Sequence, residues 1–502
     1  MLQIPQTGIY LSKLFPLRLC FDYYQYICRY LLSIMEVSCP YFDPEFENLN
    51  EKIYGPRVTV DNESCDKCTV VKVDSLNKQG LLLEVVQVLS DMDLVISKSY
   101  ISSDAEWFMD VFHVKDQRGN KVADKKVISY IQQAIGAKRE LQNSGEMKKC
   151  YDNAVRTESC SDCTAIEMIG TNRPGLFSEI SAVLAEQKCN VVEAHAWSHN
   201  ACLACVAYVS DESTSASIDD PNRLATIEDQ LSTILRPTTI ADHNCMGAKT
   251  HFLGCDSSMS RMERRLHQLM FANHDFDGPP GQVSTSFSSI NMDHVEEGRR
   301  TVVSIDRCAE KGYSVVTVEC MDRPKLMFDT VCTLTDMQYV IFHASIASHG
   351  PFSYQEYYIR HKDGYTLDTE DERLQVIKCL EAAIERRVCE GVRLELCAEN
   401  SVGLLPNVTR ILREYGLTVA RADIATDGEK IKNVFYIQDT SGNKVDMRLV
   451  ELMERELQPL AFQVKNELLL PPNDTSMERE SFSFVGLLRS QLERFSHSFI
   501  PI

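Results

Sequence analysis

Hydrophobic positions along the chain repeat in a fixed order of short strands and amphipathic helices. An apolar run of strand length, such as residues 70–73, is followed by a turn that contains asparagine or aspartate. Beyond the first turn, Leu82, Val85, Val86 and Leu89 recur at helical spacing. Two β-rich segments and a second helix follow. The pattern predicts a strand–helix–strand–strand–helix unit, usually completed by a last strand.

The same unit occurs four times, and two copies share sequence as well as pattern. Residues 110–122 (DVFHVKDQRGNKV) and 433–445 (NVFYIQDTSGNKV) are identical at seven of thirteen positions. The gap from Gly80 to Gly119 is 39 residues, and the corresponding glycines of the other copy are separated by the same 39. Because chance does not preserve both identity and spacing, the chain contains an internal repeat.

The turns and second helices place the four copies. The turns read NKQGL, NRPGL, DRPKL and NSVGL and begin at residues 77, 172, 322 and 400. Second helices are predicted at residues 125–135, 222–235, 372–387 and 447–457. These elements predict an α+β fold of four ferredoxin-like βαββαβ modules, packed in pairs through sheets and helices.

Predicted boundaries follow from this order. Residues 1–64 form an N-terminal extension, of which the first 35 are interpreted as unstructured or spurious; an organelle-targeting or membrane-surface helix is the alternative there. The modules cover residues 68–149, 163–312, 314–389 and 391–468, and residues 469–502 form a tail. The second module carries an insert at about residues 236–312, with a charged helix at residues 259–270 and a Gly/Pro/Ser stretch at residues 278–289.

The turn between a strand and a helix, followed by a hairpin and a helix, resembles the ACT domain, a small ligand-binding module. Four copies without a catalytic domain resemble the plant ACT domain repeat (ACR) family, and residues 313–337 (YSVVTVECMDRPKLMFDTVCTLTDM) are especially similar to it. Similar modules end the bacterial uridylyltransferases. The resemblance implies a non-catalytic amino acid sensor that passes a signal to a protein partner. An interaction scaffold whose modules pair without a ligand is the alternative.

The turns have the chemistry to hold an amino acid. A helix that begins after the turn directs unpaired N–H groups at a ligand carboxylate, glycine permits close approach, and asparagine offers an oxygen to an ammonium group. The candidate ligand-binding residues are Asn77, Gly80, Leu81, Asn172, Gly175, Leu176, Asn400, Gly403 and Leu404. The other interpretation is that asparagine caps the helix and glycine makes the turn.

The resemblance also implies that each turn meets the second strand of a neighbouring copy. The corresponding strand positions are Lys98, Ala194, His343 and Arg421. The third turn departs from the pattern because Lys325 replaces glycine and Asp322 replaces asparagine, and the carboxylate would repel a ligand carboxylate. Ligand binding at that turn is therefore not expected.

Composition narrows the function further. The formal net charge of −20 disfavours nucleic acid and anionic membrane partners, and no uncharged run is long enough to span a bilayer. Nineteen cysteines without a secretory signal favour reduced thiols in an intracellular compartment, the cytoplasm and/or the nucleus. Known nucleotide-binding, hydrolase and metalloprotease motifs do not occur, so the sequence predicts no enzyme and no cofactor. Homodimerisation through the modules remains open.

Two C-x-x-C pairs, Cys65/Cys68 and Cys160/Cys163, each begin 15 residues before the glycine of their module's turn. Three interpretations are open. The pairs could form one zinc site, could form redox-active disulfides, or could be ordinary thiols preserved by duplication. The last is favoured, so no metal site is predicted. His195, His199, His343 and His349 are interpreted as packing or surface residues of the second strands.

Overall fold

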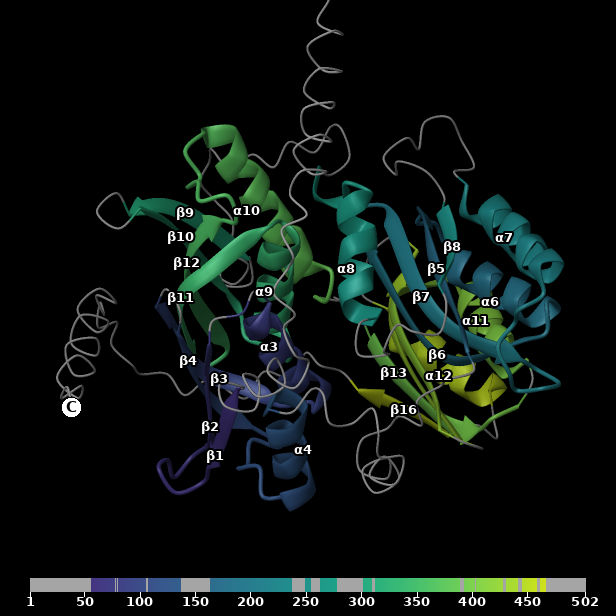
Figure 1. The fold of residues 1–502 in the computed structure, drawn as a ribbon. Helices are drawn as coiled ribbons and strands as arrows, with labels where there is room; N and C mark the ends of the chain where they lie inside the picture. The colour runs from purple at the N-terminus through teal and green to yellow at the C-terminus, as the bar shows by residue number, and fades with distance from the viewer. Residues whose placement is uncertain are drawn as a thin grey trace, which may run out of the picture. The chain divides into compact units, whose positions relative to one another are not determined.

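The computed structural model describes a set of ranges that together contain most of the four modules. They are residues 56–76, 78, 80–104, 107–136, 163–236, 249–253, 262–277, 301–308, 312–388, 392–401, 403–427, 430–440, 445–457 and 461–465. The chain divides into two compact units, Met1–Thr157 with Met292–Leu380 (unit 1) and Glu158–Asn291 with Glu381–Ile502 (unit 2) (Figure 1). The N-terminal 35 residues, residues 278–289 and the predicted tail lie outside the described residues.

Unit 1 holds the first and third modules in one antiparallel sheet, ordered β1-β2-β4-β3-β11-β12-β10-β9. The first module comprises β1 (Arg57–Asp61), β2 (Thr69–Leu76), α3 (Leu81–Asp91), β3 (Val95–Asp104), β4 (Trp107–Lys115) and α4 (Lys125–Gly136). The third comprises β9 (Val302–Cys308), β10 (Tyr313–Met321), α9 (Leu326–Asp336), β11 (Tyr339–His349), β12 (Phe352–His361) and α10 (Glu370–Glu385), whose last turn belongs to unit 2.

Unit 2 holds the second and fourth modules in a sheet ordered β16-β13-β15-β14-β6-β7-β5-β8. The second module comprises β5 (Thr164–Thr171), α6 (Leu176–Glu186), β6 (Cys189–His199), β7 (Cys202–Asp211), α7 (Pro221–Leu235) and β8 (Lys249–Leu253). The fourth comprises β13 (Val392–Glu399), α11 (Leu404–Glu414), β14 (Leu417–Asp427), β15 (Lys430–Asp439), α12 (Met447–Glu456) and β16 (Ala461–Lys465). Unit 2 also contains α8 (Met262–Ala272) and the 3₁₀ turn η3 (Asp275–Asp277).

The strand at the outer edge of each module follows the rest of the module in the sequence of unit 2 and precedes it in unit 1. In unit 2, β8 and β16 follow the second helix of their module and pair with its first strand. In unit 1, β1 and β9 precede the module and occupy the same place. The edge position beside the first strand can be occupied by an antiparallel strand from before or after the module, so the order of elements in the sequence does not decide which segment occupies it. The structure therefore differs from the predicted boundaries, which counted β1 as N-terminal extension and β9 as insert.

Second strands join the modules of each unit. In unit 2, β6 pairs with β14 so that equivalent positions, His195 and Asp423, lie opposite each other. In unit 1, β3 pairs with β11 in the same way, with Tyr100 opposite Ser345. The helices repeat this relation: the sixth residue of α6, Ser181, contacts the sixth residue of α11 at 2.7 Å between hydroxyl oxygens. Each unit is thus a pseudo-twofold pair of modules.

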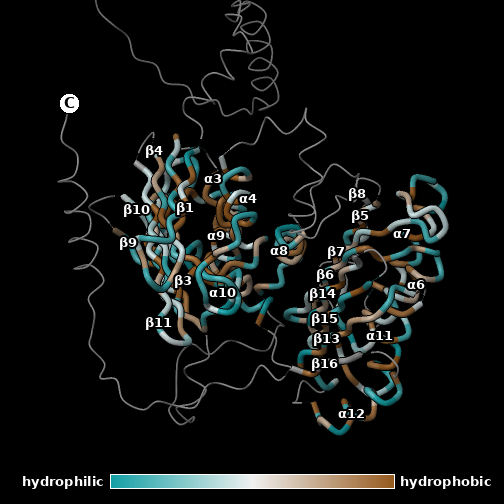
Figure 2. Tube along the Cα trace, turned by 90° about the horizontal axis from the view of Figure 1, so that it is seen from below, coloured by the Kyte–Doolittle hydropathy of each residue, from teal (hydrophilic) through white to brown (hydrophobic). Residues whose placement is uncertain are grey.

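The core of unit 2 lies between its sheet and the helices α6, α7, α11 and α12. Figure 2 shows the hydrophobic positions along the strands and the helix faces that meet them. The hydrophobic alternation of β15, for example, directs Phe435 and Ile437 into this core with no exposed surface. Burial of these side chains stabilises the unit by about 1.5–3 kcal/mol for each large aliphatic or aromatic side chain.

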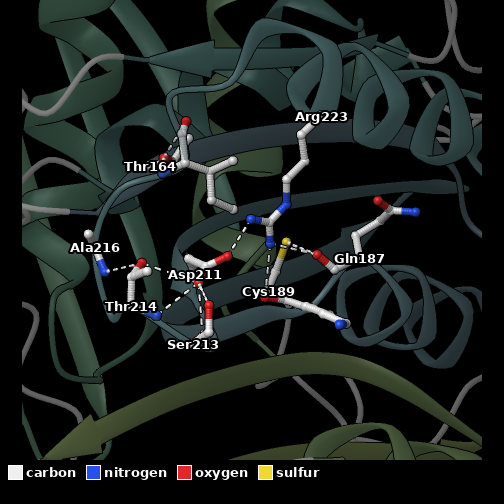
Figure 3. Close-up of polar contacts among 10 residues, drawn as sticks. Thr164, Gln187, Cys189, Asp211, Ser213, Thr214, Ala216 and Arg223 are labelled. Carbon is white, nitrogen blue, oxygen red and sulfur yellow. Dashed lines mark hydrogen bonds and ion pairs between the residues drawn. The ribbon is translucent and has the colours of Figure 1, made fainter.

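Hydrogen bonds and an ion pair connect the loops and helix α7 of the second module to its strands (Figure 3). Arg223 of α7 donates to the carboxylate of Asp211 at the end of β7 and, at 2.7 Å, to the backbone oxygen of Gln187. The Thr164 hydroxyl accepts the backbone N–H of Ile218 at 2.8 Å. Equivalent hydroxyls in unit 1 also accept a backbone N–H at 2.8 Å: Thr69 from Val122 and Ser314 from Leu367. The same hydroxyl position thus ties the segment before the second helix to the first strand in three modules.

Helix α8 packs on the sheet face opposite to the other helices of unit 2 (Figures 1 and 2). Its Leu266 and Met270 bury Trp197 of β6 completely. Beside this contact, Arg386 forms a buried bidentate ion pair with Asp275 of η3, at 2.6 and 2.7 Å. Burial alone would raise the pKa of Asp275, but the charges and hydrogen bonds of Arg386 and His199 together outweigh it and lower the pKa to about 2. The charged helix predicted in the insert is therefore an integral layer of unit 2.

Candidate functional site

The first helix of every module begins after a residue with a left-handed backbone. The φ angles are 85° at Gly80, 82° at Gly175, 64° at Lys325 and 78° at Gly403. None of these four helices has a side-chain cap hydrogen bond. The N-cap position is occupied by Gly175 and Gly403 and not by Asn172 or Asn400, and Oδ1 of Asn172 accepts no hydrogen bond. Asn77 lies outside the described residues.

The second turn borders a shallow hollow that is open to solvent and lies between the second and fourth modules. Asn172 and Gly175 approach it from the turn, and Arg413 of α11 and Thr418 of β14 approach it from the other module. An added Cβ on Gly175 would lie 2.6 Å from Cδ of Arg413. Glycine is needed here both for the positive φ and for the position of the arginine side chain.

Two polar atoms of this hollow are buried without a partner. Oδ1 of Asn172 and Oγ1 of Thr418 have no hydrogen bond in the structure. The Asn172 backbone is fixed, since its N–H donates to the Ala201 oxygen at 2.7 Å. Buried polar atoms are nearly always paired, and an unpaired one costs about 1–3 kcal/mol. The pair therefore marks a place where a polar ligand or water is favoured.

The N-terminus of α6 supplies hydrogen-bond donors to the same hollow. Phe177 and Ser178, which line it, are the second and third residues of the helix. The Leu176 N–H donates to the Arg173 oxygen and the Glu179 N–H to the Gly175 oxygen, both at 3.1 Å, which leaves the two N–H groups between them without a helical acceptor. Together with the helix dipole, they favour an anionic group.

Arg173 lines the hollow, but most of its guanidinium contacts are with its own module. It donates to Glu179 in the first turn of α6 at 2.7 Å and to the Ile234 oxygen at 3.2 Å. Arg323 repeats the arrangement in the third module with the buried Asp329, at 2.7 Å. The arginine of the Arg-Pro turn thus fixes the loop to its own helix.

The third turn also borders a shallow hollow, which the sequence did not predict. It lies between the third and first modules and is lined by Asp322, Lys325 and, from the first module, Ser90. Lys325 adopts the left-handed backbone that glycine has elsewhere, so the turn keeps its shape. Burial raises the pKa of Asp322. The hollow has no counterpart of Arg413, because Ser90 is the tenth residue of α3 as Arg413 is of α11.

The first and fourth turns are more open. A Cβ on Gly80 or Gly403 would meet no atom within 4 Å, and Asn400 is exposed. Pro406 is the third residue of α11 and removes one of the N–H donors that α6 presents. The leucines that follow the turns, Leu81, Leu176 and Leu404, are buried in the cores, so their side chains serve packing. These two turns offer less to an anionic ligand than the second turn.

The second-strand residues that the resemblance implied do not line either hollow. The residue equivalent to Lys98, His343 and Arg421 is Glu193 and not Ala194, because each of the four lies 18 residues after the left-handed residue of its turn and directly after the bulge of its second strand. The second strand of the neighbouring module contributes residues that precede its bulge: Val419 at one hollow and Ile96 at the other. Arg421 instead forms an ion pair with Asp423 at 2.8 Å.

The histidines of β6 contact carboxylate side chains. His195 contacts Asp423 through Nδ1 at 2.7 Å and Glu193 through Nε2 at 3.2 Å. Burial alone would lower the pKa of His195, but the two carboxylates outweigh it and raise the pKa to about 9. His199 contacts the buried Asp275 at 3.1 Å. The His195 contact links β6 to β14, and the His199 contact lies beside α8. The spacing of residues in the sequence did not predict either contact.

Within the described ranges, no group of three or more His, Cys, Asp or Glu side chains could hold a metal ion. The helices in those ranges include none with the length and apolar character needed to cross a membrane.

These modules, joined in pairs with hollows at their turns, define a protein of the ACT type. The model of the ACR family N-terminal ACT domain matches residues 64–142 and 389–463, and an ACT domain model matches residues 164–233. The chain is 54% identical to ACT domain-containing protein ACR2 of Arabidopsis thaliana, covering 93% of this chain and all of that protein. It is 52% identical to ACR3 of the same plant, over 84% and 90% of the two chains. The chain belongs to the ACR family of ACT domain-containing proteins.

A distant similarity supports the second resemblance. An 80-residue segment is 34% identical to the bifunctional uridylyltransferase/uridylyl-removing enzyme of Gluconobacter oxydans, covering 16% of this chain and 8% of that enzyme. The family models that match describe ACT domains and no catalytic domain. Both the predicted fold class and the predicted family are confirmed.

Proposed function

We propose that this ACR protein is a non-catalytic sensor that binds one free amino acid in the hollow between its second and fourth modules. The observation that carries the proposal is the pair of unpaired buried oxygens, Asn172 Oδ1 and Thr418 Oγ1, beside an uncapped helix N-terminus. Acceptors on one side and N–H donors on the other match the ammonium and carboxylate groups of an amino acid.

Roles follow from the chemistry of each group. Asn172 Oδ1 and the Thr418 hydroxyl accept hydrogen bonds from the ligand ammonium. The backbone N–H groups of Phe177 and Ser178 bind its carboxylate, with Arg413 as the cation nearby. The hollow is shallow and includes Leu203 and Leu412 in its lining, which favours a ligand with a small side chain.

The proposed signal is a change in how firmly the two modules are joined. A ligand that contacts the turn of one module and α11 of the other binds best when both are in place, so it favours that arrangement. A protein partner that distinguishes the two arrangements would then respond to the ligand. Homodimerisation is a further proposal. The described cysteines other than Cys163 form no disulfide bonds, which favours an intracellular location, the cytoplasm and/or the nucleus.

The alternative is a scaffold whose modules pair and bind nothing, which the continuous β6–β14 pairing favours. Isothermal titration calorimetry of the full chain against each of the twenty amino acids separates the two functions. One or a few small amino acids should bind with a stoichiometry of one per chain. Absence of heat and of any thermal stabilisation for all twenty would support the scaffold.

A further inference from the structure

Two cysteine sulfurs lie next to each other in the connection between β1 and β2. Sγ of Cys65 and Sγ of Cys68 are 3.1 Å apart. Cys68 is 5% exposed, whereas Cys65 is partly exposed to solvent. The remaining approach to a disulfide bond length of about 2 Å is small and needs little backbone movement.

Hydrogen bonds hold this connection in place. Asp61 Oδ1 accepts the N–H groups of Glu63 and Ser64 at 2.8 and 3.0 Å. Asn62 receives the Thr69 hydroxyl at 2.6 Å and donates to the Val122 oxygen at 3.0 Å. Because the turn is already fixed on both sides of the cysteine pair, joining the sulfurs costs little further conformational entropy.

We propose that Cys65 and Cys68 form a redox-active dithiol that low-molecular-weight disulfides, such as glutathione disulfide, oxidise to an intramolecular disulfide. The Cys65 thiolate attacks one sulfur of glutathione disulfide, and one glutathione leaves as a thiolate that takes up a proton. Cys68 then loses its proton and attacks Sγ of Cys65, which expels the second glutathione. The protein dithiol loses two electrons and two protons, and glutathione disulfide becomes two thiols.

The environment assigns the two roles. The hydrogen bond from Cys68 and the backbone N–H groups of Lys67 and Cys68 lower the pKa of Cys65. Burial raises the pKa of Cys68 to about 11, with the neighbouring Cys65 adding to the effect. A partly exposed thiol of lowered pKa is the attacking group in such pairs, and a buried neighbour resolves the mixed disulfide.

The second module carries a cysteine at the same place. Cys163 precedes Thr164 of β5 as Cys68 precedes Thr69 of β2, and Cys163 is disulfide-bonded in the structure. Its partner lies outside the described residues, because the other described cysteines are free. This position in the module thus accommodates an oxidised cysteine.

Trapping of the mixed disulfide tests the proposal. The reduced full chain is treated with glutathione disulfide at pH 7, free thiols are blocked with N-ethylmaleimide, and peptides are analysed by mass spectrometry. Wild type should accumulate the Cys65–Cys68 disulfide, and reduced dithiothreitol should reverse it. Cys68→Ser should hold glutathione on Cys65, and Cys65→Ser should leave Cys68 largely unmodified. The exposed Cys397 serves as the internal control, and Cys65 should react about tenfold faster than it does.

Two results would overturn the proposal. One is a mixed disulfide on Cys65 that persists equally in wild type and in Cys68→Ser, because Cys68 would then resolve nothing. The other is a Cys65 no more reactive than Cys397. The wild-type result stands by itself if either variant melts at a markedly lower temperature.

Discussion

His195 and Asp423 occupy equivalent positions in the second and fourth modules and face each other across the β6–β14 pairing, with Nδ1 2.7 Å from Oδ1. The corresponding residues of unit 1 are Tyr100 and Ser345, which carry no charge. In unit 2, the two central strands are therefore connected by an ionic contact in addition to their backbone hydrogen bonds. The two units share one architecture and differ in what fixes their central strands.

The stability of unit 2 should depend on pH through this contact. His195 has a folded-state pKa of about 9, against 6.5 for an unperturbed histidine. A raised folded-state pKa contributes stability that is fully present below pH 6.5 and is lost as the pH rises through 9. The difference corresponds to at most about 3 kcal/mol, since one pKa unit is about 1.4 kcal/mol.

Urea unfolding of His195→Gln measures this contribution. Trp197 is the only tryptophan besides Trp107, so a Trp107→Phe background makes its fluorescence a reporter of unit 2. The variant should be less stable than its background by about 2–3 kcal/mol at pH 6, and the difference should shrink to below about 1 kcal/mol at pH 9.5. A difference that is the same at both pH values would show that His195 is uncharged in the folded protein.

Asp275→Asn should destabilise unit 2 strongly. The substitution leaves the guanidinium of Arg386, whose side chain is 1% exposed, without its anionic partner. Removal of one member of a buried ion pair costs about 3–5 kcal/mol. Glu414→Gln is the matched control, because Glu414 and Arg410 form an ion pair with side chains 48% and 44% exposed. That loss should stay below about 1 kcal/mol. Equal losses for both, read from Trp197 fluorescence in urea, would mean that the buried pair does not fix α8.

Gly175→Ala and Gly403→Ala separate backbone strain from contact with Arg413. Both glycines have positive φ, so both substitutions should cost about 1 kcal/mol of stability. Only the Cβ at residue 175 meets Arg413, at 2.6 Å, and it would push that side chain away from the hollow. Thermal melts should therefore shift by similar amounts, whereas calorimetry should show weaker ligand binding for Gly175→Ala alone. Equal affinities in the two variants would remove Arg413 from the site.

Local features of the fold could be predicted from the sequence because they follow from periodicity and turn residues. The helix expected at residues 125–135 is α4 (Lys125–Gly136), and the helix expected at residues 447–457 is α12 (Met447–Glu456). The partners of the modules could not be predicted in this way. Pairing of the first module with the third depends on contacts between β3 and β11, far apart in the chain, and no local pattern specifies them.

The candidate site was predicted only in part. The asparagine and glycine of the second turn, which the sequence singles out, border the hollow, but Arg413 and Thr418 come from the other module and follow no motif. Glu193 is the strand residue equivalent to Lys98, His343 and Arg421, and the predicted Ala194 lies one position beyond it, although the equivalent bulges of the four strands keep the spacing from the turn at 18 residues. The Asp322 turn forms a hollow despite its departure from the pattern, because Lys325 tolerates the left-handed backbone.

The most direct test of the account is a calorimetric titration of the full chain, Asn172→Ala and Asn400→Ala with the amino acid that the screen identifies. Asn172 presents a buried, unpaired oxygen, whereas Asn400 occupies the equivalent place in an exposed turn. Asn172→Ala should weaken binding by about 1–3 kcal/mol, and Asn400→Ala should leave the affinity within about twofold of wild type. Thermal melts of the unliganded variants should be nearly unchanged, since neither asparagine caps its helix. Equal losses of affinity in the two variants, or no loss in Asn172→Ala, would contradict a ligand site between the second and fourth modules.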